Sequence, residues 1–152
     1  MEDVVGAADT GRSRGDGSRW RDNRLLWFVA VWGPVVLACG AIFALSSIPG
    51  RMFPRVGFPG YDKLVHAGIY AVLGLVVVRA VCLSTRWPFR VAALVTVLAG
   101  TAHGALDELH QGFVPHRAVQ AGDLAADGAG VALACVVWWA LVQRHRRRTD
   151  AG

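Results

Sequence analysis

Four long apolar stretches, separated by short segments rich in charge, glycine and proline, run along this chain of 152 residues. The first, residues 25–45, has no charged side chain, and two others cover about residues 64–83 and 123–142. The third stretch in chain order begins near Val91 and ends in the polar segment 102–117. A helix of about 20 apolar residues crosses the hydrocarbon core of a bilayer. The pattern therefore predicts an all-α polytopic membrane protein, a bundle of four transmembrane helices.

The segments outside these stretches predict how the chain is divided. Residues 1–24 are rich in Gly, Asp, Ser and Arg and have little apolar surface to bury, which is typical of a disordered arm. Residues 25–142 are expected to form the transmembrane domain, and residues 143–152 a basic tail. Pro34 stands in the middle of the first apolar stretch and predicts a kink there.

Lysine and arginine are distributed unequally between the two predicted sides of the membrane. Twelve of the 16 fall in the N-terminal arm, around the linker before the third span and in the C-terminal tail. The other four fall in or beside the two loops on the opposite side. Because cytoplasmic segments carry an excess of Lys and Arg, both termini are expected in the cytoplasm. The polar segment 102–117 then lies at the extracytoplasmic face.

Composition narrows the classes of function. The hydrophobic fraction of 54% exceeds the usage of soluble domains, roughly 45–50%. The net charge of +5 is explained by topology and by anionic lipid head groups, so no nucleic-acid partner is expected. Cys39, Cys82 and Cys135 lie in different apolar stretches without CxxC spacing, which favours packing over a disulfide or a zinc site.

Ionisable and polar side chains gather in three groups at one predicted depth, the extracytoplasmic ends of the second, third and fourth spans. In each of the first two groups, three members are spaced four residues apart and therefore share one helix face. The third group is a pair of aspartates one helical turn apart. The groups are Asp62, Lys63, His66 and Tyr70; His103, Asp107, Glu108 and Gln111; and Asp123 and Asp127, with Arg117 in the loop before the last pair.

Helix capping accounts for only part of this pattern. Asp62 and Asp123, near helix N-termini, are favoured by the helix dipole, whereas Asp107 and Glu108 stand late in an outgoing helix, where acids oppose it. Asp127 lies about 6 Å deeper than Asp123, where a carboxylate must be neutral or paired with a cation or an imidazole. Since ionisable residues in spans usually have a function, the three groups together predict a ligand-binding pocket that opens outward.

Several chemistries suit such a pocket. Carboxylates beside an imidazole can perform general acid–base catalysis, with Asp107, Glu108 and His66 as the candidate catalytic residues. Arg117 can hold a phosphate or a carboxylate in bidentate fashion. Neither a metal centre nor a cofactor is expected, because the sequence has no HExxH or comparable ligand motif.

The order and spacing of these residues resemble the VanZ-like family of small bacterial membrane proteins. Three motifs carry the resemblance across residues 25–142: D-K-x-x-H-x-x-x-Y from Asp62, D-E-x-x-Q-x-F-x-P-x-R from Asp107, and D-x-x-A-D-x-x-G from Asp123. The family commonly has asparagine at the position of Asp127. The resemblance implies a multi-pass protein of the bacterial cell membrane with a cell-envelope role. The founding member of the family is associated with low-level resistance to the glycopeptide antibiotic teicoplanin.

Two main hypotheses of function follow. In the first, the pocket binds a lipid-linked or amphiphilic envelope ligand, such as a cell-wall precursor or a lipoglycopeptide. The alternative is a membrane-embedded hydrolase or transferase that acts on a phospholipid or isoprenoid-phosphate head group. A proton-coupled transporter and an assembly factor with Gly- and Ala-rich packing faces are further alternatives, and a second copy of the chain is a further candidate partner. His110 and His116 are expected at the surface.

Overall fold

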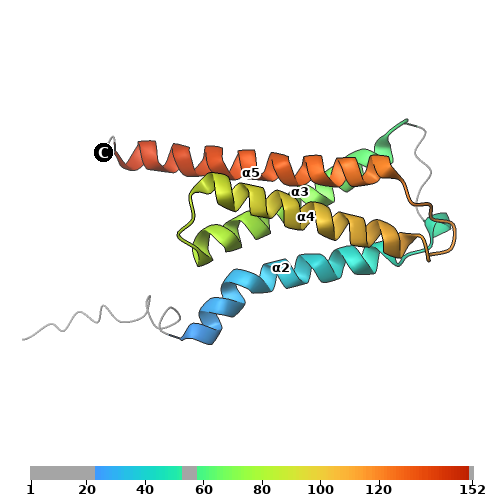
Figure 1. The fold of residues 1–152 in the computed structure, drawn as a ribbon, viewed down its shortest axis with the longest axis horizontal. Helices are drawn as coiled ribbons and strands as arrows, with labels where there is room; N and C mark the ends of the chain where they lie inside the picture. The colour runs from blue at the N-terminus through green and yellow to red at the C-terminus, as the bar shows by residue number, and fades with distance from the viewer. Residues whose placement is uncertain (1–22, 53–57, 151–152) are drawn as a thin grey trace, which may run out of the picture.

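Helices account for most of the described chain. The computed structural model describes residues 23–52 and 58–150, and within these ranges it contains helices, turns and short irregular connections but no strand (Figure 1). The elements in chain order are α2 (Arg24–Ser46), the short 3₁₀ helix η1 (Gly50–Met52), α3 (Tyr61–Ser84), α4 (Phe89–Gln111) and α5 (Ala121–Thr149). Each of the four α-helices is long and apolar enough to cross a membrane. The predicted all-α fold of four membrane-spanning helices is confirmed.

The observed boundaries differ from the predicted ones mainly at the C-terminal end. α5 continues beyond residue 142 to Thr149, and its last turn holds Arg146, Arg147 and Arg148, where the helix dipole favours positive charge. The predicted basic tail is therefore largely part of the helix. The predicted disordered arm, up to residue 22, lies outside the described residues.

α2 begins at a side-chain cap and contains a proline. The Asn23 side-chain oxygen accepts hydrogen bonds from the backbone N–H groups of Leu25 (3.1 Å) and Leu26 (3.3 Å), which have no partner within the helix. Pro34 leaves the helix continuous, and Figure 1 shows the helix axis changing direction after the blue N-terminal turns. Because proline removes a backbone donor and crowds the preceding turn, this bend agrees with the predicted kink.

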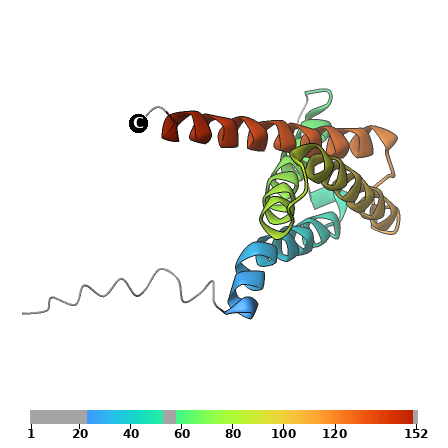
Figure 2. The same ribbon diagram turned by 60° about the vertical axis from the view of Figure 1, so that its left-hand side comes forward.

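α3 lies at the centre of the bundle. It contacts α2, α4 and α5, whereas α2 and α5 lie on opposite sides of it and make no contact in the described chain (Figures 1 and 2). The start of α2 and the end of α5 lie at the same end of the bundle (Figure 1). The α2–α3 and α4–α5 connections meet at the other end, where the Gly50 N–H donates to the carbonyl oxygen of Pro115 (3.2 Å).

Small residues bring α3 and α5 close together. A Cβ atom added at Gly130 of α5 would collide with the backbone carbonyl oxygen of Ala67 on α3. A Cβ atom added at Gly74 of α3 would stand 2.8 Å from the Cβ of Ala134 and 2.9 Å from the Cα of Val131. Glycine at these two positions therefore permits a close backbone approach, which is the usual packing device of membrane helices.

Most of the large apolar side chains face away from the bundle interior. Val36, Leu37, Leu98 and Leu133 are between 58% and 75% exposed, whereas the buried apolar cluster around Tyr70 is small. An exposed apolar surface of this extent is unfavourable in water and suits the acyl chains of a bilayer. Together with the four apolar helices, it identifies a multi-pass integral membrane protein.

Candidate functional site at the polar end of the bundle

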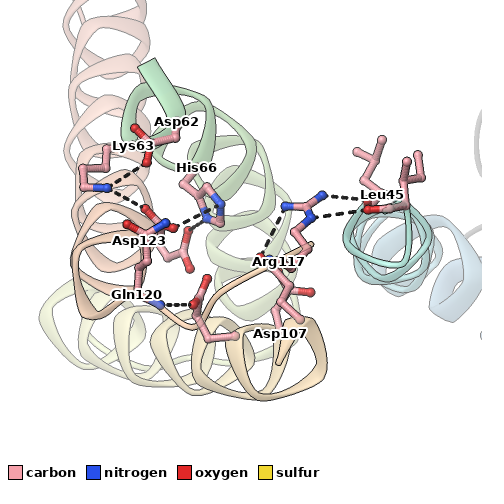
Figure 3. A network of polar contacts seen from close by, with 12 residues as sticks. Leu45, Asp62, Lys63, His66, Asp107, Arg117, Gln120 and Asp123 are labelled. Carbon is pink, nitrogen blue, oxygen red and sulfur yellow. Dashed lines mark hydrogen bonds and ion pairs between the residues drawn. The ribbon is translucent and has the colours of Figure 1, made fainter. Parts of the chain in front are cut away.

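The polar side chains predicted from the sequence converge at one end of the bundle. The first turns of α3 and α5 and the last turn of α4 meet there, beside the α2–α3 and α4–α5 connections (Figure 3). Four carboxylates in this region, called the polar end below, are only 0–7% exposed: Asp107, Glu108, Asp123 and Asp127. Buried carboxylates require hydrogen bonds or cations in compensation, so their partners define the site.

Lys63 joins α3 to α5 through two carboxylates. Its Nζ lies 2.8 Å from Asp62 Oδ2 and 3.0 Å from Asp123 Oδ1 (Figure 3). Asp123 is buried, whereas the Asp62 side chain is about half exposed. The N-cap residues of α3 and α5 are Gly60 and Gln120, and neither makes a side-chain cap bond. Capping therefore does not explain the two aspartates, which instead share one ammonium group.

His66 forms a second link between α3 and α5. Its Nδ1 lies 3.0 Å from Asp127 Oδ1, and its Nε2 lies 4.0 Å from Asp123 Oδ2. Asp127 is fully buried, and Gly104 of α4 makes room for it, because a Cβ atom there would stand 2.8 Å from Asp127 Oδ2. Asp127 is thus paired with an imidazole, one of the partners expected for a carboxylate at this depth.

A further chain of bonds connects α4 to α2 through Arg117. Gln111 donates from Nε2 to Asp107 Oδ2 (3.0 Å), and its Oε1 accepts from Arg117 Nη1 (3.3 Å). Arg117 also donates from Nε to the Ile48 carbonyl and from Nη2 to the Leu45 carbonyl, each at 3.3 Å (Figure 3). Arg117 therefore fastens the α4–α5 connection to the end of α2. The predicted bidentate capture of an anion would compete with these bonds.

Glu108 faces the start of α5. Its Oε2 accepts a hydrogen bond from the backbone N–H of Gln120 (2.8 Å), while its Oε1 is buried without a hydrogen-bond partner among the described residues. Asp127 Oδ2 is in the same situation. Leaving a buried acceptor unsatisfied costs roughly 1–3 kcal/mol, and more for a charged group. At these two oxygens, therefore, the described residues supply no hydrogen-bond donor to a buried carboxylate.

Two histidines of α4 contact neighbouring helices. His103 Nδ1 lies 3.1 Å from the hydroxyl oxygen of buried Tyr70 on α3. His110 Nε2 lies 3.1 Å from Ser47 Oγ, and its ring packs against Phe43 of α2 with the ring centroids 4.6 Å apart. His110 is half-buried, because α2 packs against its ring, so it is less exposed than expected. The sequence carries no signal of that contact.

A pocket of about 620 Å³ lies at the polar end, between α2, α3 and the α4–α5 connection. Small-molecule sites commonly have volumes of about 300–1,000 Å³. Exposed His116, which was expected at the surface, borders this pocket with its backbone at φ 62°. Seven of the predicted site residues line the pocket: Asp62, His66, Tyr70, Asp107, Gln111, Arg117 and Asp123. The other four contact a lining residue from behind: Lys63, His103, Glu108 and Asp127.

Backbone groups complete the site and were not predicted. The Gln120 N–H binds Glu108, and the Leu45 and Ile48 carbonyls bind Arg117. A backbone group carries no signature in the sequence. The only available signal was position, since the first N–H groups and last carbonyls of helices lack partners within the helix.

Comparison of the chain with protein-family models, with curated proteins and with solved structures finds no significant match. Its function is therefore inferred from its own residues and their geometry. These describe a multi-pass integral membrane protein with a pocket and a cluster of buried carboxylates at one end of the bundle.

Proposed function

We propose that this protein is a VanZ-like envelope protein of the bacterial cell membrane whose pocket opens to the extracytoplasmic side and binds a lipid-linked or amphiphilic ligand. The orientation rests on the unequal distribution of Lys and Arg, and the family on the three motifs that begin at Asp62, Asp107 and Asp123. The observation that carries the proposal is the composition of the pocket lining, which combines apolar side chains of α2 and α3 with carboxylates of α3, α4 and α5.

The apolar part of the lining suits a lipid chain. Ile42 and Leu45 of α2 and Val65 and Ile69 of α3 form it, and the outer surfaces of the same helices are apolar and exposed. An acyl or isoprenoid chain that enters from the bilayer therefore stays in apolar surroundings. Because the chain is already out of water in the bilayer, the apolar lining accepts it without a solvation penalty, and the affinity has to come from packing and from the head group.

The polar part of the lining contains three carboxylates. These are Asp62, Asp107 and Asp123, while Arg117 donates to the carbonyls of Leu45 in α2 and of Ile48 just beyond it. Carboxylates accept hydrogen bonds from hydroxyl and ammonium groups. A head group rich in such donors suits this lining better than a bare phosphate. Glycosylated cell-wall precursors and lipoglycopeptides belong to this class, which would link the protein to glycopeptide sensitivity.

Ligand-dependent thermal stabilisation tests the proposal. Purified full-length protein in detergent is heated with teicoplanin and, separately, with a lipid-linked disaccharide precursor, and a rise in melting temperature is expected with at least one of them. Asp107→Asn removes an anionic acceptor without changing its shape and should abolish most of the rise. Asp150→Asn, at the far end of α5, is the matched control.

Arg117 requires a separate control because it also holds the fold together. Arg117→Ala is compared with the parent for melting temperature without ligand, and only its ligand-induced rise is interpreted. If Asp107→Asn and Arg117→Ala both show the same rise as the parent with the same probe, the pocket is not the binding site and the proposal is wrong.

The His66–Asp127 pair favours a second function, a membrane-embedded hydrolase or transferase acting on a phospholipid or isoprenoid-phosphate head group. A buried carboxylate 3.0 Å from Nδ1 fixes the imidazole orientation, and His66 lines the pocket. An imidazole held in this way can act as a general base. This geometry favours His66 as the base over Glu108, which does not line the pocket. Incubation with radiolabelled lipids should then give product that His66→Gln abolishes, and absence of turnover with and without added metal would rule out this function.

A further inference from the structure

We propose that the polar end contains a binding site for one divalent transition-metal ion, with His66, Glu108 and Asp123 as its protein ligands. The sequence predicted no metal, because no two of these residues form a ligand motif; each comes from a different helix, α3, α4 and α5. The proposal goes beyond ligand binding in the pocket and does not depend on it.

The three side chains are close enough to share one ion. One nitrogen of His66 and one carboxylate oxygen each from Glu108 and Asp123 lie within 4.8 Å of one another, and His66 Nε2 is 4.0 Å from Asp123 Oδ2. Ligand atoms in a tetrahedral zinc site are about 3.4 Å apart when each bond is about 2.1 Å. The observed separations exceed this spacing by less than about 1.5 Å.

Glu108 provides an independent indication of a bound cation. Its residue surface is 3% exposed, and its Oε1 has no hydrogen-bond donor among the described residues. Glu108 Oε2 is already bound to the Gln120 N–H, so Oε1 is the atom left for a metal. A cation at this point would satisfy the oxygen, since buried charges are stable when they are paired or coordinate metals.

In each proposed ligand, a second polar atom of the side chain is bound to another residue of the protein. His66 Nδ1 is bound to Asp127, Asp123 Oδ1 to Lys63, and Glu108 Oε2 to the backbone N–H of Gln120. Such outer partners orient metal ligands, and a carboxylate on the second nitrogen of a ligating histidine is one of their recurring forms. His66 therefore has its carboxylate partner on Nδ1 and its Nε2 directed toward Asp123 (Figure 3).

Electrostatics favour a cation at this position. Five carboxylates lie at the polar end within the described ranges, four of them buried, against Lys63, Arg117 and the exposed Arg51. Lys63 contacts one edge of the cluster, at Asp123 Oδ1 and Asp62. A dication between Asp123 Oδ2 and Glu108 Oε1 would offset negative charge that these side chains leave uncompensated.

The ligand set indicates the type of ion. An imidazole with two carboxylates suits Zn²⁺ or Mn²⁺ better than Mg²⁺ or Ca²⁺, which prefer oxygen ligands alone. Three protein ligands leave a zinc ion with an open coordination position. His66 and Asp123 also line the pocket, so the proposed ion would lie beside it.

Calorimetric titration with Zn²⁺ tests the site. Purified full-length protein is stripped with a chelator and titrated in metal-free detergent buffer; one Zn²⁺ per chain should bind, and a large excess of Mg²⁺ should not displace it. Glu108→Gln keeps the acceptor for Gln120 but loses the anionic ligand. Loss of an outer partner weakens metal binding about 10–100-fold, which is the effect expected for Asp127→Asn. Glu108→Gln removes a ligand itself and should weaken Zn²⁺ binding at least about 100-fold.

Matched controls separate this site from adventitious binding. The triple variant His110→Gln, His116→Gln and His145→Gln removes three histidines outside the cluster and should bind Zn²⁺ like the parent. Elution volume and helicity without metal establish that each variant is folded, and His66→Gln and Asp123→Asn replace Glu108→Gln if it aggregates. A parent chain that binds no Zn²⁺, affinity unchanged in the cluster variants, or affinity lost in the triple variant would each overturn the proposal.

Discussion

Gly130→Ala should destabilise the protein strongly, because Gly130 is where α5 lies closest to the backbone of α3. The added Cβ would collide with the Ala67 carbonyl oxygen and would stand 3.0 Å from the Ala67 carbonyl carbon and 3.0 Å from the Ala71 nitrogen. All three atoms belong to the backbone, so no side-chain rotation can relieve the clash. The two helices must separate, and their separation disturbs the pairs Lys63–Asp123 and His66–Asp127 that connect them.

The magnitude follows from two opposing effects. Overpacking a close contact typically costs about 1–3 kcal/mol. Because the obstacle here is rigid backbone, we expect a cost at the upper end, about 3 kcal/mol. Replacing glycine by alanine in a helix returns at most about 1 kcal/mol. Gly68→Ala on α3 is the matched control, since a Cβ atom there meets nothing within 4 Å. The helix-propensity gain is common to both variants, so their difference, about 3 kcal/mol or roughly 100-fold in the unfolding equilibrium, reports the clash.

Unfolding of both variants by SDS in mixed micelles, followed by circular dichroism, measures this difference. A folded Gly130→Ala protein whose free energy of unfolding equals that of Gly68→Ala would refute the close approach of α3 and α5. The Zn²⁺ affinity of Gly130→Ala provides a second readout, because the proposed ligands come from helices that the added methyl group forces apart.

Three further predictions concern the polar end and the orientation of the chain. Tyr70→Phe removes the bond between a buried hydroxyl and His103 and should lower the free energy of unfolding by about 1 kcal/mol in the same titration; an unchanged value would mean that the bond contributes nothing. Arg117→Lys retains the charge but cannot bridge Leu45, Ile48 and Gln111 together, so we expect a loss of about 1–3 kcal/mol, and full stability would contradict the clamping role. In a chain without Cys39, Cys82 and Cys135, a membrane-impermeant maleimide applied to intact cells should label Phe113→Cys, whose parent side chain is 88% exposed, and should not label Arg86→Cys; the reverse pattern would invert the proposed topology.

The amphiphile-binding proposal and the metal proposal assign different roles to the neighbouring carboxylates Asp107 and Glu108. Asp107 lies on the pocket side and is bonded to Gln111, whereas Glu108 lies toward α5 and is bonded to the Gln120 backbone. These neighbours in sequence therefore separate the two proposals. Asp107→Asn should weaken binding of the amphiphile with little effect on Zn²⁺, and Glu108→Gln should have the larger effect on Zn²⁺.

The sequence by itself determined the four helices and the end at which their polar residues gather. Apolar stretches of about 20 residues have one stable arrangement in a bilayer, because a helix satisfies its backbone hydrogen bonds internally. Helical spacing then placed Asp62, His66 and Tyr70 on one face, and the alternating direction of successive spans brought polar segments from three helices to one side. Both inferences use local properties of the chain, which is why they did not require its tertiary structure.

Tertiary structure alone decided which of these residues contact one another. Helical spacing orders residues around one helix but does not specify the rotation or depth at which two helices pack; contacts at Gly74, Gly104 and Gly130 set those quantities here. In the packed bundle Asp127 pairs with His66, Glu108 faces the Gln120 backbone, and His110 packs against Phe43 of α2. Whether a carboxylate lines the pocket, supports an imidazole or is available to a metal is consequently a property of the packed bundle, because it depends on distances between helices that no single helix encodes.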